Sequence, residues 1–151
     1  MPRYVLIAVV VLVAGCASNK QVRDTRTEFL SPPAMQALNL PLSDAVRAGK
    51  LLFLSGKIGN VPGSMTLVSG GIQAETRQTM EHIRRSLERY GASMDQVVKC
   101  TVFLADMREW GAMNEVYSSF FPTNKPARSA LGASGLALDA RVEIECIAAL
   151  D

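Results

Sequence analysis

The chain is poor in the residues that usually bind metal ions. Its 151 residues include one histidine and three cysteines. A structural zinc site takes four ligands, most often cysteine and histidine. The single histidine, His82, lies beside charged residues, and we expect it to be a solvated surface residue rather than a ligand. The sequence therefore predicts no metal site.

The chain also lacks a strong charge of either sign and is poor in aromatic residues. The formal net charge is +2, and aromatic residues make up 6% of the sequence. Nucleic-acid binding favours a basic stripe with stacking aromatics, and the densest basic pair in the part expected to fold is Arg84-Arg85. We therefore predict no nucleic-acid partner. With 48% hydrophobic and 20% charged residues, the composition is typical of one globular domain.

The hydrophobic run near the N-terminus, Tyr4 to Ala14, is too short to cross a bilayer, which takes about 20 residues. It follows the basic Arg3 and ends at Gly15-Cys16, a pattern typical of a secretory signal. The segment resembles a bacterial lipoprotein signal peptide, residues 1–15, which implies cleavage before Cys16 and lipid attachment to its thiol. The alternatives are a buried N-terminal strand and a signal cleaved without lipidation.

The lipoprotein resemblance predicts a protein attached to a membrane in the bacterial cell envelope. In a Gram-negative cell, Ala17-Ser18 after the cysteine resembles sorting to the periplasmic side of the outer membrane. Residues 16–36 show neither a helical nor a strand period, so we interpret them as a lipid-anchored flexible tether. The folded domain is expected over residues 37–151.

Periodicity within that domain predicts an α+β fold. Gly49-Lys50 lies between two apolar segments and indicates a hairpin turn. A helix is expected over 73–90, ended by Gly91, a strand over 97–104 and a second helix over 107–121. The residues expected to form the apolar sides of the helices are Ile72, Thr76, Met80, Ile83 and Leu87 in the first, and Trp110, Met113, Val116, Tyr117 and Phe120 in the second. The order β-β-α-β-α-β-β favours two helices packed on one face of a mostly antiparallel sheet.

The C-terminal part contains the candidate site. In the strand 141–149, Val142, Ile144, Cys146 and Ala148 share an apolar face, whereas Glu143 and Glu145 share the other. Arg128 lies on the preceding strand, after Pro126. An arginine and a glutamate that meet at the edge of a buried sheet are able to bind a carboxylate and activate water. The alternative is a structural ion pair on a solvated face.

Several segments match one family in residue type and spacing. They are Leu52-Phe53-Leu54-Ser55-Gly56, Lys99-Cys100-Thr101-Val102-Phe103-Leu104, Asn114-x-x-Tyr117-x-x-Phe120-Phe121-Pro122, Pro126-Ala127-Arg128-Ser129-x-Leu131, Ser134-x-Leu136 and Val142-Glu143-Ile144. On these segments, from about residue 41 to 149, the chain resembles the RidA/YjgF family. The resemblance implies a chorismate-mutase-like fold assembled as a homotrimer, with sites in the clefts between subunits.

The resemblance also implies a chemistry, the hydrolysis of 2-imino acids to 2-keto acids and ammonia without a metal or other cofactor. At the positions that match the family motif, the resemblance implies that Arg128 binds the carboxylate of the imino-acid substrate. It implies that Glu143 positions the attacking water and transfers its proton. Ser55, Gly56 and Asn114 match positions that line the same cleft. The chain departs from the family pattern at Leu42, where a tyrosine is common, and at Ala130, where a cysteine is common; both changes make the pocket more apolar. The alternative function is a non-catalytic trimer that binds small carboxylates or serves interactions.

The remaining cysteines, Cys100 and Cys146, each lie on an apolar strand face. A disulfide is conceivable behind a signal peptide, because the compartment is then oxidising. We nevertheless expect two buried free thiols.

Overall fold

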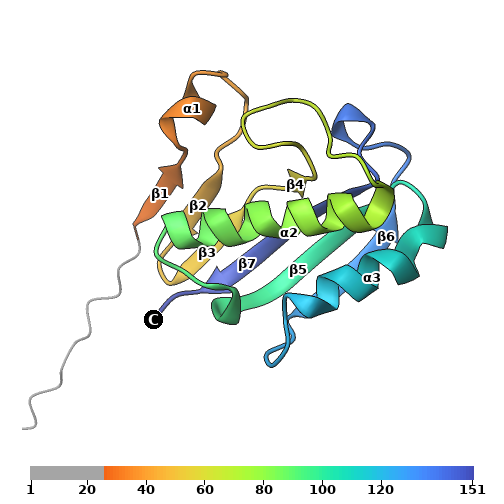
Figure 1. Ribbon diagram of the computed structural model, residues 1–151. Coiled ribbons are helices and arrows are strands. Elements are labelled where there is room, and N and C mark those ends of the chain that lie inside the picture. The colour runs from red at the N-terminus through yellow and green to blue at the C-terminus, as the bar shows by residue number, and fades with distance from the viewer. Residues whose placement is uncertain (1–25) are drawn as a thin grey trace, which may run out of the picture.

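The computed structural model describes residues 26–151. The predicted signal peptide and the predicted lipidation site Cys16 lie outside the described residues. None of the helices within 26–151 is long and apolar enough to cross a membrane. The elements, labelled in Figure 1, are β1 (Thr27–Leu30), α1 (Pro33–Gln36), β2 (Ala45–Ala48), β3 (Leu51–Leu54), β4 (Lys57–Ile58), α2 (Gly71–Arg89), η1 (Met94–Gln96), β5 (Val97–Leu104), η2 (Met107–Glu109), α3 (Trp110–Ser119), β6 (Ala127–Gly132), η3 (Ala137–Asp139) and β7 (Val142–Ala149).

The strands form one mixed sheet in the order β1-β2-β3-β7-β5-β6, and the short β4 pairs with the N-terminal end of β7. All pairings are antiparallel except that of β5 with β6. The turn at Gly49-Lys50 joins β2 to β3, as predicted. Because β5 lies between β6 and β7, the two C-terminal strands are not neighbours. The direction of their side chains therefore follows from the register of each strand against β5.

The two long helices, α2 and α3, lie across one face of the sheet (Figure 1). The core between them and the sheet contains the apolar face of β7 that the alternation predicts, because Val142, Ile144, Cys146 and Ala148 are all buried. The α+β class with helices on one face is thus confirmed. The opposite face of the sheet, which we call the open face, carries no element in the described part of the chain.

Helix α2 follows its predicted apolar stripe. All five residues of that stripe are buried against the sheet. The helix ends at Arg89, and Gly91 follows with a φ of +78°, a left-handed conformation that a glycine adopts without a steric cost. The N–H of Ala92 donates to the carbonyl of Leu87 at 2.8 Å and that of Gly91 to Glu88 at 3.2 Å, the pairing of a Schellman motif.

The tether predicted for residues 16–36 is wrong over its C-terminal part. Residues 27–30 form β1, which pairs with β2, and residues 33–36 form the single turn α1. The side chains of β1 are mostly exposed, so its place depends on main-chain pairing rather than on an apolar pattern. The folded domain therefore begins about ten residues earlier than the predicted boundary at 37.

The prediction of free thiols is also wrong. Cys100 of β5 lies directly opposite Cys146 of β7, and the two form a disulfide across a separation of 46 residues. Both cysteines are buried in the core. Antiparallel register brings Cα atoms of opposed residues to the short separation that a disulfide needs, and the Cα atoms here are 4.1 Å apart.

Candidate functional site

The residues predicted to form the site fall into two groups on opposite faces of the sheet. Arg128 pairs with the buried Cys100, so its side chain lies on the helix-covered face. Glu143 stands between the buried Val142 and Ile144, so its side chain points to the open face. The expectation that Arg128 and Glu143 meet is therefore not fulfilled within one chain, nor do they form the alternative, a structural ion pair.

The first group surrounds Arg128 at the outer strand β6. Its Nη1 donates to Oδ1 of Asn114 on α3 at 2.7 Å. Its guanidinium lies over the ring of Tyr117, 4.7 Å from the centroid, and 5.6 Å from that of Trp110. Ala130 lies on the same face, partly buried against the core. Stacking and one hydrogen bond hold the guanidinium while most of its donors remain available.

Trp110 thus has a different position from the one predicted. It was expected on the apolar side of the second helix, but η2 precedes α3 and Trp110 opens the helix, with 39% of its surface exposed. Within residues 26–151, Arg128 has no carboxylate partner, whereas Arg141 is paired with Glu75 and Glu109. A half-buried arginine without an acidic partner is a ready binding point for an anion.

The second group surrounds Glu143 at the end of the sheet where β4 pairs with β7. Glu143 is half-buried and, among the described residues, its carboxylate makes no hydrogen bond or ion pair. Gly56 lies directly against it: a Cβ built on Gly56 would stand 1.9 Å from Oε1 of Glu143. Leu42, Gly56 and Glu143 line one open pocket of about 640 Å³. Absence of a side chain at Gly56 is therefore what lets the carboxylate occupy this position.

The surroundings of Glu143 raise the pKa of its carboxyl above the ordinary value of 4.5. Burial is the main cause, because it disfavours the charged form, and the negative charge of Glu145 on the same strand face adds to it. A carboxylate with a raised pKa is a stronger base than an ordinary glutamate. The site thus contains an unpaired base of increased proton affinity.

Ser55 belongs to the second group, but its hydrogen bonds go to backbone carbonyl groups. Its Oγ donates to the carbonyl of Ser43 at 2.6 Å, and its N–H donates to the carbonyl of Asp44 at 3.1 Å. These bonds hold the segment that carries Leu42 against β3 and β4. Ser55 therefore supports the wall of the pocket and does not line it.

Sequence reasoning missed a buried polar network behind the pocket. The carboxylate of Asp44, 4% exposed, accepts hydrogen bonds from Lys57, from Tyr90 at 2.8 Å and from Arg89 at 3.3 Å. Burial alone would raise the pKa of Asp44, but the hydrogen bond and charge of Lys57, with Tyr90 and Arg89, outweigh burial and lower it. Burial and the Asp44 carboxylate raise the pKa of Tyr90 to about 12. The one available signal was a polar residue near the start of a strand, and this signal does not identify partners that lie 45 and 46 residues away.

His82 also differs from its prediction as a solvated residue. It is half-buried, and its Nε2 lies 2.8 Å from the carbonyl oxygen of Asn60 and 3.2 Å from Nε2 of Gln78. The histidine thereby ties the loop between β4 and α2 to the helix. Within residues 26–151 no group of three or more histidine, cysteine, aspartate or glutamate side chains is arranged to hold a metal ion.

Comparison with known proteins identifies the family. The family model described as Endoribonuclease L-PSP matches residues 33–150. The chain is 40% identical over 108 residues to 2-iminobutanoate/2-iminopropanoate deaminase of Mus musculus, an alignment that covers 72% of this chain and 79% of the mouse protein. It is 38% identical over 125 residues to the chloroplastic Reactive Intermediate Deaminase A of Arabidopsis thaliana, covering 83% of this chain and 67% of the plant protein.

Among solved structures, the crystal structure of E. coli TdcF with bound serine superposes with a TM-score of 0.70 at 30% identity, covering 74% of this chain and 90% of that one. The family model spans most of the described residues, and the relatives align over most of their length. Together they identify the family of the chain. The chain belongs to the RidA/YjgF family, whose family model is described as Endoribonuclease L-PSP.

Proposed function

We propose that the protein is a deaminase that hydrolyses 2-imino acids to 2-keto acids and ammonia. The observation that carries the proposal is Arg128, a guanidinium held by Asn114 and Tyr117 and without an acidic partner among residues 26–151. Its planar fork suits bidentate binding of a carboxylate. Relatives named as deaminases of 2-imino acids, and a relative crystallised with serine, support a small carboxylate as the ligand.

Glu143 supplies the base in this proposal. Its carboxylate accepts a proton from a water molecule while the water oxygen bonds to the imine carbon. That proton then passes to the nitrogen to give a carbinolamine. The proton of its new hydroxyl group is transferred to the nitrogen as the carbon–nitrogen bond breaks, so that one imino acid and one water give one keto acid and one ammonia. Ionised Glu143 is the active form, and its raised pKa makes it a better acceptor than an ordinary glutamate.

We propose further that each site is shared by two copies of the chain in a homotrimer. Arg128 and Glu143 lie on opposite faces of one sheet, so one chain cannot bring both to one substrate. If the open face of one copy packs against the β6 side of the next, the Glu143 of the first and the Arg128 of the second line one cleft. Exposed apolar side chains on the open face, Leu51 at 40% and Phe53 at 38%, favour such packing.

Imine hydrolysis by purified protein tests the function directly. An amino-acid oxidase generates the imine in the presence of semicarbazide, and faster loss of the trappable imine measures the deaminase. We expect wild-type protein to accelerate this loss and Arg128→Ala to lower kcat/KM by at least about a hundredfold, because the charge-assisted bonds to the carboxylate are lost. Arg108→Ala is the matched control, since the side chain of Arg108 is 90% exposed and, among residues 26–151, its ion-pair partner is Asp106.

The alternative, a non-catalytic carboxylate-binding protein, gives a different result in the same experiments. It predicts that 2-keto acids raise the melting temperature of the wild type, that Arg128→Ala abolishes this effect, and that no preparation hydrolyses imines. Imine hydrolysis that is equal in wild type and Arg128→Ala would contradict the non-catalytic alternative and the proposed role of Arg128.

We also propose that the mature protein is attached to the bacterial cell envelope through a lipid on Cys16. The charged start, short apolar run and Gly15-Cys16 junction support this location. The disulfide between Cys100 and Cys146 supports it independently, because disulfides persist in oxidising compartments. Mass spectrometry of the mature N-terminus is the test; an unprocessed Met1 or an unmodified Cys16 would refute the anchor.

A further inference from the structure

The pocket that contains Glu143 extends well beyond the carboxylate. It lies where the sheet ends at β4, between the segment 32–44 and the loop that joins β4 to α2 (Figure 1). Its volume of about 640 Å³ is within the range of small-molecule sites. The smallest 2-imino acids, which carry a methyl or ethyl side chain, would leave most of it to water.

The polar groups that border this pocket are mostly engaged with each other. Lys57 and Arg89 bind Asp44, and His82 lies against the carbonyl oxygen of Asn60. Glu143 and the exposed Arg85 are the exceptions, because neither side chain has a hydrogen bond or an ion pair in the described part of the chain. A ligand that enters beyond Glu143 therefore meets few polar groups that still need a partner.

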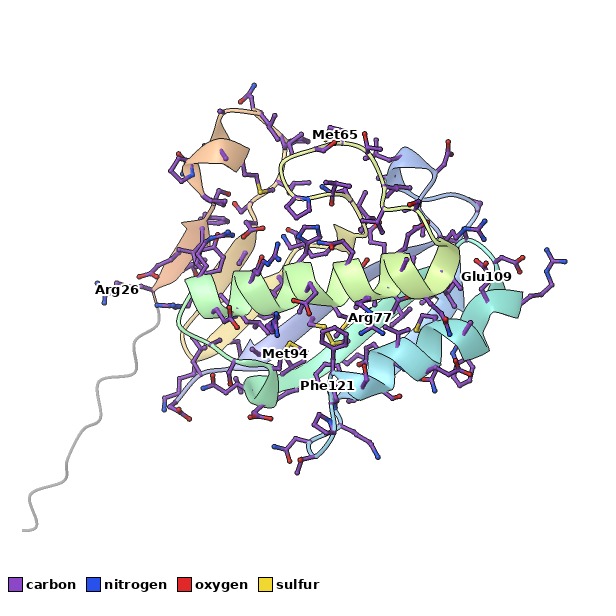
Figure 2. All side chains as sticks on the ribbon, viewed as in Figure 1. Arg26, Met65, Arg77, Met94, Glu109 and Phe121 are labelled. Atoms are coloured by element: carbon purple, nitrogen blue, oxygen red, sulfur yellow. A yellow bond between two sulfur atoms is a disulfide. The ribbon has the colours of Figure 1, made fainter. Side chains whose placement is uncertain are left out.

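The rest of the wall is mostly apolar, and many of its side chains are exposed to water. Met35, Leu38, Leu40 and Leu42 come from the segment before β2, Ile58 from β4 and Met65 from the facing loop, which Figure 2 shows at the same end of the molecule as α1. Leu38 is 58% exposed, Leu42 50% and Met65 63%. Covering such side chains with an apolar group removes their surface from water, which is favourable in proportion to the area covered.

We propose that this pocket receives the side chain of the substrate, and that the preferred substrates are 2-imino acids with large apolar side chains, such as those derived from leucine, methionine and phenylalanine. The proposal rests on the deaminase function, since it places the imine carbon beside Glu143 and the side chain among the leucines. Methionine at 35 and 65 suits side chains of different shape, because its own side chain is flexible.

The experiment measures kcat/KM for imines generated from alanine, leucine, methionine, phenylalanine and glutamate. We expect the leucine-derived imine to exceed the alanine-derived one by at least about tenfold, because added methylene groups in an apolar pocket give discrimination of this order. Met65→Asn should lower the rate on the leucine-derived imine several-fold more than that on the alanine-derived one. Met107→Asn is the control, since Met107 is similarly exposed, at 46%, and does not line the pocket.

Binding of the product keto acids gives a second measurement that does not need turnover. The leucine-derived keto acid should raise the melting temperature more than pyruvate does, and Met65→Asn should remove the difference. If imines are hydrolysed but the alanine- or glutamate-derived one is preferred, the pocket proposal is overturned and the deaminase stands. If no imine is hydrolysed but the large keto acid binds better, the deaminase fails and the apolar pocket stands.

Discussion

At the scale of single residues, the carboxylate of Glu143 depends on Gly56, against which it lies. The space for the Glu143 carboxylate exists only because Gly56 has no side chain. We predict that Gly56→Ala lowers kcat/KM by about a hundredfold, since a displacement of about 1 Å in a reacting group has costs of that size. Melting temperature should change little, because the displaced atoms are the end of a side chain that is free to turn away.

Gly135→Ala is the matched control for this substitution. No atom lies within 4 Å of a Cβ built there, and the backbone of Gly135 is not in the left-handed region. Activity assays and thermal melts of both variants suffice. Full activity in Gly56→Ala would show that catalysis does not need the carboxylate where it now lies.

The raised pKa of Glu143 makes a second prediction, on pH dependence. The base is active when ionised, so kcat/KM should fall as the pH drops through its pKa, with the midpoint above the ordinary 4.5. Glu145→Gln should move that midpoint to lower pH, because the negative charge of Glu145 contributes to the shift. A pH profile of each protein with one imine measures both effects.

The raised pKa of Glu143 also affects the free energy of unfolding. Ionisation of Glu143 lowers this free energy, whereas ionisation of a carboxylate with a cationic partner raises it. Since the folded pKa of Glu143 exceeds the unfolded one, the ionised group costs folding free energy at pH values above the folded pKa, and the cost disappears below the unfolded pKa. Glu143→Gln should therefore be inactive yet at least as stable as the wild type at pH 7, with no gain at pH 4. Loss of stability in this variant at pH 7 would mean that the carboxylate has a structural partner.

At the scale of elements, the disulfide joins the two central strands β5 and β7. It closes a loop with a sequence separation of 46, for which chain entropy predicts about 4 kcal/mol of stabilisation relative to the reduced protein. We predict that Cys100→Ala with Cys146→Ala lowers the free energy of unfolding by about 2–4 kcal/mol. Denaturant unfolding with and without reductant measures it: reductant should destabilise the wild type and leave the double variant unchanged.

Periodicity predicted the elements that pack with a regular face and failed for those that do not. The stripe of α2 and the alternation of β7 repeat over several turns or pairs, so burial leaves a clear pattern in the sequence. Strand β1 has four mostly exposed residues and is held by main-chain bonds to β2, which leave no such pattern. The disulfide needs the register of β5 against β7, which no local sequence pattern contains.

The candidate site shows the same limit. Family resemblance predicted that Arg128, Glu143, Gly56 and Asn114 line one cleft. Within one chain they form two separate pairs, because Arg128 contacts Asn114 and Glu143 lies against Gly56. The face on which each side chain lies depends on which strand it pairs with: β6 runs parallel to β5, and this register directs Arg128 towards the helices. The network around Asp44 joins residues far apart in sequence, and only the packing of α2 beside β4 and the segment before β2 reveals it.

At the scale of the whole molecule, the two faces of the sheet carry complementary unpaired charges. A half-buried guanidinium and a half-buried carboxylate, each without a partner of opposite charge in residues 26–151, are costly unless something else satisfies them. In the proposed trimer, a substrate carboxylate and a water molecule between two copies of the chain would satisfy both. Each copy then provides one Arg128 and one Glu143, but to different sites.

This arrangement predicts complementation between two inactive variants. In a mixture of Arg128→Ala and Glu143→Gln, some sites receive the intact arginine of one copy and the intact glutamate of the other. If equal amounts are unfolded together and refolded, random assembly into a closed ring gives about one quarter of the wild-type activity. Each variant refolded alone should remain inactive, which is the necessary control.

A second mixture combines wild type with a double variant that carries both Arg128→Ala and Glu143→Gln. If each site is shared by two copies in a ring, about one quarter of the sites in this mixture are intact. If each chain has a complete site of its own, half of the sites are intact. Mixtures that stay inactive in the first case and retain half of the activity in the second would show that one chain forms the site alone.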